Sequence, residues 1–95
     1  MKLVKVWNED SYINYDYIIS INIETVFQKT EDGNYKVCVW SGASDNSYGC
    51  CTVYRAEDLK SCAFAVEWLA SHKGDGIIDL QNMDNGKRNT KQLLG

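Results

Sequence analysis

The chain has 95 residues, of which 44% are hydrophobic and 12% aromatic, with four cysteines and no proline. These values are typical of one small globular domain spanning residues 1–95, and no apolar run approaches the roughly 18 residues that a membrane span needs. The net charge of −3 disfavours nucleic acid as a direct ligand, because phosphate backbones are bound by clustered Lys and Arg.

The N-terminal stretch MKLVKVWNED is predicted to form a strand over residues 3–7 that ends at the turn-forming residues NEDS (8–11). Its apolar part is too short for a secretory signal, so we expect a cytoplasmic protein with reduced thiols. Residues 12–27 alternate between apolar and polar side chains, which is typical of a half-buried antiparallel strand. Sixteen residues would be long for one strand, so a bend is expected near Asp16.

Two further strands are predicted at YKVCVW (35–40) and CTVYR (51–55). The segment 29–36 predicts a hairpin, because Asp32-Gly33-Asn34 can adopt the positive φ values of a tight turn. The residues between the two strands, 41–49, are polar and contain glycine, which is typical of a loop.

The second half of the chain predicts one helix over about 58–73, with Glu57 or Asp58 at its start and Lys73-Gly74 at its end. IIDL (77–80) is a candidate fifth strand, and residues 82–95 are expected to be a flexible tail. The order of elements predicts an α+β fold: an antiparallel four- to five-stranded meander, either open or curled toward a barrel, packed against one helix near residues 58–73.

The first 70 residues resemble the small flagellar FlbD-type proteins and similar short bacterial or phage proteins. The matching residues are Ile13, Asn14, Asp16, Ile18 and Ile21, within a strand, turn, strand and acidic helix entry over about 3–70. The glycine-led first turn of that family is replaced here by NEDS, and the loop 41–49 and the tail are additional. The resemblance implies an architecture and carries no function.

The predicted helix carries apolar residues on two sides. At about 100° per residue one arc follows the spacing of a core-facing stripe, made of Leu59, Cys62, Ala63, Val66, Leu69 and Ala70. Phe64 and Trp68 lie on nearly the opposite side, flanked by Glu67. Two interpretations remain open: residues 77–80 fold back over the two rings, or the rings form a surface for a protein partner or a homodimer.

The strands offer a second aromatic surface. If Val37, Val39, Cys51 and Val53 line the core, Trp40, Tyr54 and Trp7 are expected on the outer face of the sheet. Such a platform can stack on a ligand or a partner. The alternative is cross-strand aromatic pairing that only stabilises the sheet.

The cysteines follow the spacing C-x₁₁-C-C-x₁₀-C, which lacks the paired C-x₂₋₄-C of structural zinc sites. Cys50 and Cys51 would point to opposite faces of a strand, so Cys38, Cys50, Cys51 and Cys62 are interpreted as small buried hydrophobes. His72, the only histidine, suits the C-terminal end of a helix, and the paired carboxylates fall at turns and caps. We therefore expect no metal, no cofactor and no catalytic residues.

The sequence thus favours a small non-enzymatic protein-binding module, an adaptor or a stoichiometric inhibitor. Its size and acidity are also typical of phage or mobile-element proteins directed at a host defence protein such as a nuclease. The predicted partner-binding residues are Phe64, Trp68, Glu67, Trp40 and Tyr54. The alternative function is binding of a small molecule on the aromatic sheet face.

Overall fold

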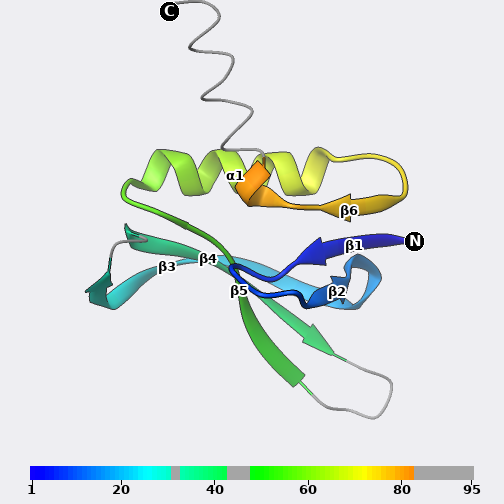
Figure 1. The fold of residues 1–95 in the computed structure, drawn as a ribbon, viewed down its shortest axis with the longest axis horizontal. Helices are drawn as coiled ribbons and strands as arrows, with labels where there is room; N and C mark the ends of the chain where they lie inside the picture. The colour runs from blue at the N-terminus through cyan, green and yellow to red at the C-terminus, as the bar shows by residue number, and fades with distance from the viewer. Residues whose placement is uncertain (31–32, 43–47, 83–95) are drawn as a thin grey trace, which may run out of the picture.

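The computed structural model describes residues 1–30, 33–42 and 48–82. Its elements in chain order are β1 (Lys2–Lys5), β2 (Tyr12–Asn14), a 3₁₀ helix η1 (Tyr15–Tyr17), β3 (Ile18–Thr30), β4 (Gly33–Gly42), β5 (Tyr48–Ala56), α1 (Leu59–Ser71) and β6 (Gly76–Ile78). The strands form two three-stranded sheets, β3-β4-β5 and β2-β1-β6, which pack with the helix α1 (Figure 1). The α+β class is confirmed. The prediction of a single meander is wrong, and the described strands do not close into a barrel.

The larger sheet is the antiparallel meander β3-β4-β5. Ile21 lies opposite Val39, and Cys38 lies opposite Thr52. The predicted hairpin between the first two strands is confirmed, since Thr30 pairs with Gly33 across it, although residues 31–32 lie outside the described residues. β4 extends further than predicted, to Gly42, and β5 begins earlier than predicted, at Tyr48. Residues 43–47 of the expected loop lie outside the described residues.

A β-bulge in β5 reverses the alternation expected for that strand. Val37 lies opposite Tyr54, but the next residue, Cys38, lies opposite Thr52, so Val53 is the extra residue. Val53 and Tyr54 are therefore both directed into the core, and each is 1% exposed. The prediction that Tyr54 lies on the outer face is wrong, because the bulge shifts the alternation by one residue.

Trp7 also belongs to the interior side. Its ring meets that of Tyr54 edge to face, with the centroids 5.8 Å apart. Its backbone N–H donates to the Thr52 carbonyl at 2.9 Å, and its half-buried side chain packs against the core. The expectation of an outer-face Trp7 is therefore wrong as well.

The bend expected near Asp16 is confirmed, and it divides the predicted strand 12–27 into two. The Asn14 side-chain oxygen accepts a hydrogen bond from the Asp16 backbone N–H at 3.0 Å, which caps η1. The chain thereby leaves the small sheet after β2 and enters the meander at β3.

The small sheet joins the two ends of the described chain. β1 lies between β2, which is antiparallel to it, and β6, which is parallel to it with Val4 opposite Ile78. The predicted strand at 77–80 is confirmed in part: β6 covers Gly76–Ile78, whereas residues 80–82 are helical. It does not extend the meander, because its partner is β1.

α1 begins and ends close to the predicted residues. The Asp58 side chain accepts a hydrogen bond from the Ser61 backbone N–H at 2.7 Å and forms the N-cap. The helix ends at Ser71, with His72 as its C-cap, and Gly74 has a φ of +98° in the following turn.

The buried side of α1 is rotated relative to the predicted arc. Cys62 and Leu69 are buried as expected, but Ala65 is also buried, and Leu59, Ala63 and Ala70 are exposed. The rotation brings the large Trp68 ring against the core in place of two alanines, which removes more apolar area from water. The predicted arc is therefore wrong on one flank.

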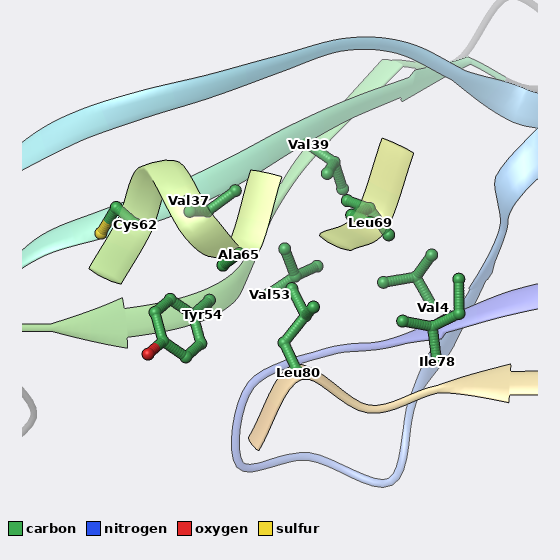
Figure 2. Close-up of a cluster of buried hydrophobic side chains, with 10 residues drawn as sticks. All are labelled: Val4, Val37, Val39, Val53, Tyr54, Cys62, Ala65, Leu69, Ile78 and Leu80. Carbon is green, nitrogen blue, oxygen red and sulfur yellow. The ribbon is translucent and has the colours of Figure 1, made fainter. Parts of the chain in front are cut away.

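The core lies between the meander, α1 and the small sheet. Figure 2 shows its ten buried side chains: Val4, Val37, Val39, Val53, Tyr54, Cys62, Ala65, Leu69, Ile78 and Leu80. They come from both sheets, from the helix and from the segment after β6. The core thus depends on residues from the first five positions of the chain and from the region after the helix.

Candidate functional site

The two aromatic side chains predicted on the outer side of α1 differ in burial. Phe64 is 42% exposed, whereas Trp68 is half-buried and packs against the core, with its ring centroid 5.5 Å from that of His72. Ile78 and Leu80 are core residues, and Ile77 is 58% exposed. Of the two rings, Phe64 is therefore the more exposed.

Other apolar side chains accompany Phe64 on the exposed side of α1. Leu59 is 55% exposed, and Ala63 and Ala70 are exposed as well. We define the outer helix surface as Leu59, Lys60, Ala63, Phe64, Glu67 and Ala70. The sequence pattern assigns Leu59, Ala63 and Ala70 of this surface to the core. Helical periodicity identifies an apolar arc, but it does not show which edge of the arc is buried.

Trp40 lies on the opposite side of the meander from the helix. It is 43% exposed, and it alternates along β4 with the buried Val39. Tyr54 of the predicted aromatic platform is buried in the core. The neighbours of Trp40 on the outer face are Ser20 of β3 and Cys50 of β5, which lie opposite it. The structure therefore does not bring Trp40 and Phe64 into one surface.

The four cysteines occupy three environments. Cys38 and Cys62 are buried, Cys51 is half-buried, and Cys50 is exposed. Burial raises the pKa of the Cys62 thiol to about 11, with the nearby Asp58 carboxylate adding to the effect. The interpretation of all four as buried hydrophobes is wrong for Cys50.

Cys38 and Cys50 share the outer face of the meander with Glu24. The carboxylate oxygen and the two Sγ atoms all lie within 4.8 Å of one another. The sequence pattern alone gave no indication that Glu24 could be a metal ligand. Glu24 is one of the polar residues of β3 that alternate with Ile21 and Ile23, so the sequence pattern places it on the outer face. Only the register of the strands shows that it lies near the two thiols.

The candidate acid–base residues are dispersed. His72 lies at the end of α1, whereas Cys38 and Cys50 lie on the face of the meander away from the helix. Asp75 accepts a hydrogen bond from the N-terminal ammonium of Met1 at 2.8 Å, and this contact lowers the pKa of its carboxyl. Glu57 and Asp58 lie at the start of the helix, as expected, and Glu31 and Asp32 lie outside the described residues.

No family model, curated protein or solved structure matches this chain. Within the described residues, no helix is long and apolar enough to cross a membrane.

Proposed function

We propose that the chain is a non-enzymatic binding module that docks a partner protein through the outer helix surface. The exposure of Phe64 and Leu59 on one helix carries this proposal. Covering the exposed part of each side chain is worth about 1 kcal/mol, roughly half of the value for full burial. An amphipathic helix that presents two such anchors suits a hydrophobic groove on another protein.

The charges around this surface support a basic partner. Glu57 and Asp58 are exposed at the start of α1, and Glu67 lies within the outer helix surface, where Lys60 is the one basic residue. The whole chain carries 13 acidic residues against 10 basic ones. A groove with a basic rim is a feature of proteins that bind nucleic acids, so a stoichiometric inhibitor of a nuclease, of phage or mobile-element origin, is the specific function that we favour.

Variants of the two anchors test the proposal. The partner is captured from a lysate of the source organism and titrated in purified form with the wild type, Phe64→Ser and Leu59→Ser. Each variant is expected to weaken binding roughly fivefold, equivalent to about 1 kcal/mol. Binding is also expected to weaken with rising salt, because exposed charges are screened.

Ile77→Ser is the matched control. Ile77 is 58% exposed, but it lies on β6 and not on the helix, so this variant is expected to bind like the wild type. Equal binding by all three variants would contradict the proposal. Light scattering provides a second check: a wild-type dimer that Phe64→Ser converts to a monomer would show that a second copy occupies the surface.

The alternative function, small-molecule binding on an aromatic sheet face, loses support from the burial of Tyr54 and the packing of Trp7 against the core. Trp40 alone remains on that face from the predicted platform. The helix surface therefore stands as the better candidate.

A further inference from the structure

The outer face of the meander brings together three side chains that can bind a metal ion. Glu24 lies on β3, Cys38 on β4 and Cys50 on β5, and their ligand atoms are within 4.8 Å of one another. Cys38 is opposite Thr52, while Cys50 is opposite Trp40. Glu24, Cys38 and Cys50 therefore form a diagonal across the sheet, and one ion would contact all three strands.

The surroundings of Cys38 are unusual for an outer sheet face. Its side chain is 0% exposed, whereas Glu24 and Cys50 are exposed. Burial raises the pKa of the Cys38 thiol, and the nearby Cys50 and Glu24 raise it further. Lys36 and the Thr52 hydroxyl, which lies 4.0 Å from the Cys38 sulfur, lower this pKa in part. Three acidic groups this close repel one another when ionised, and a cation removes that repulsion.

We propose that Glu24, Cys38 and Cys50 form a zinc site with two thiolate ligands and one carboxylate ligand. Zn²⁺ accepts this donor set in tetrahedral geometry, with Zn–S near 2.3 Å and Zn–O near 2.0–2.2 Å. Ligand atoms around such an ion lie about 3.5–3.8 Å apart, so small side-chain rotations close the distance. The two thiols release their protons to solvent on binding, and a water occupies the fourth position beside the exposed Glu24 and Cys50.

A metal accounts for this arrangement better than a disulfide does. Cys38 and Cys50 are diagonal neighbours, because the residue directly opposite Cys38 is Thr52. The Cα atoms of diagonal residues on adjacent strands are about 7–8 Å apart, whereas those of a disulfide are usually about 4.4–6.8 Å apart. An ion between the two sulfurs spans the larger separation, and it also gives Glu24 a role.

The test uses the full chain, reduced and stripped of metal with a chelator. Zn²⁺ is titrated against a chromophoric competitor, and Co²⁺ serves as a spectroscopic probe because thiolate-to-cobalt charge transfer absorbs in the near ultraviolet. We expect one ion per chain and an apparent affinity that falls as the pH is lowered, by up to roughly 100-fold per pH unit, since two protons compete with the ion.

Cys50→Ser and Glu24→Gln are the informative variants, because both residues are exposed and their replacement leaves the core intact. Cys50→Ser is expected to lose on the order of 100-fold in zinc affinity, since even residues that only hydrogen-bond to a metal ligand are worth about 10–100-fold. It is also expected to lose part of the charge-transfer band. Glu24→Gln is expected to weaken zinc binding but keep the band.

Cys51→Ala is the matched control. Cys51 follows Cys50 in the sequence, but it lies opposite Val39, so its thiol is on the core side of β5. It is expected to bind zinc like the wild type. Absence of zinc binding by the wild type, equal binding by Cys50→Ser, or a Cys38–Cys50 disulfide formed in preference to the metal complex would overturn the proposal. The site lies on the face away from α1, so none of these outcomes bears on the outer helix surface.

Discussion

Gly33 shows how one residue without a side chain holds two elements together. It begins β4 with a φ of +113°, a conformation that L side chains rarely adopt. A Cβ atom at this position would collide with the Ala56 backbone and lie 2.7 Å from the Glu57 nitrogen. The Gly33 carbonyl also accepts a hydrogen bond from Arg55 Nη2 at 2.8 Å. The start of β4 is thereby fixed against the end of β5.

Gly33→Ala is expected to lower the free energy of unfolding by about 2–4 kcal/mol, because the methyl group adds a backbone collision to the φ strain. Gly74→Ala is the matched control: its φ is +98°, but its Cβ position is open, so only the strain of about 1–2 kcal/mol is expected. Urea denaturation measures both. Equal losses in the two variants would show that the contact with Ala56 contributes nothing.

At the scale of elements, the end of α1 depends on the first strand. Lys2 Nζ donates to the His72 carbonyl at 2.6 Å and to the Leu69 carbonyl at 3.5 Å, and it lies 3.7 Å from the centre of the Tyr15 ring. The sequence pointed to His72 as the cation suited to this helix end. The structure places the Lys2 ammonium there, where it meets the partial negative charge of the last carbonyls.

Replacement of Lys2 with Met keeps the apolar stem and removes the charge. It is expected to lower the free energy of unfolding by about 1–2 kcal/mol, from the loss of the helix-end and cation–π interactions. Lys5→Met is the control, because Lys5 Nζ contacts only the neighbouring Val6 carbonyl in the described residues, at 3.4 Å. A thermal melt of both variants at low salt decides between them, and a Lys2→Met protein as stable as Lys5→Met would refute the interpretation.

Most elements were predictable because their signals are local. Alternation located β3, β4 and β5, the acidic entry located the start of α1, and the bend near Asp16 followed from strand length. The bulge in β5 was not predictable, because Val53 and Tyr54 are both apolar and either alternation can be built from them. The rotation of α1 was missed because periodicity does not record that Trp68 has more area to bury than Ala63.

At the scale of the whole molecule, the chain closes on itself through the small sheet. Leu3 lies opposite Ile77 in the parallel β1–β6 pair, and the Gly76 backbone N–H donates to the Met1 carbonyl at 3.0 Å. Leu80 follows this pair and is 0% exposed in the core. The segment after the helix is therefore a structural part of the domain.

Leu80→Ala is expected to lower the free energy of unfolding by about 2–5 kcal/mol, as for other buried leucines replaced by alanine. Ile77→Ala removes a similar volume from a side chain that is 58% exposed, so a change within about 0.5 kcal/mol is expected. Equilibrium unfolding in urea compares them. A near-neutral Leu80→Ala would mean that the segment after β6 contributes little to the core.

The arrangement of the two sheets was the least predictable feature. The parallel pairing of residues 3–4 with residues 77–78 leaves no periodic signal in the sequence, because each segment has only the pattern of a short strand. The same limit applies to the cluster of Glu24, Cys38 and Cys50. Its members are ordinary strand residues until the register of three strands is known. Non-local pairing, and not propensity, decides both.

The position of β1 between β2 and β6 has a consequence for biosynthesis. β1 leaves the ribosome well before its parallel neighbour β6, which begins only at Gly76, after β2, β3, β4, β5 and α1. Until that neighbour emerges, one edge of β1 and the apolar surface that Ile78 and Leu80 later cover stay open to water and to chaperones. This core is thus complete only after Leu80 has left the ribosome, and a product that stalls before that residue would be a substrate for quality control.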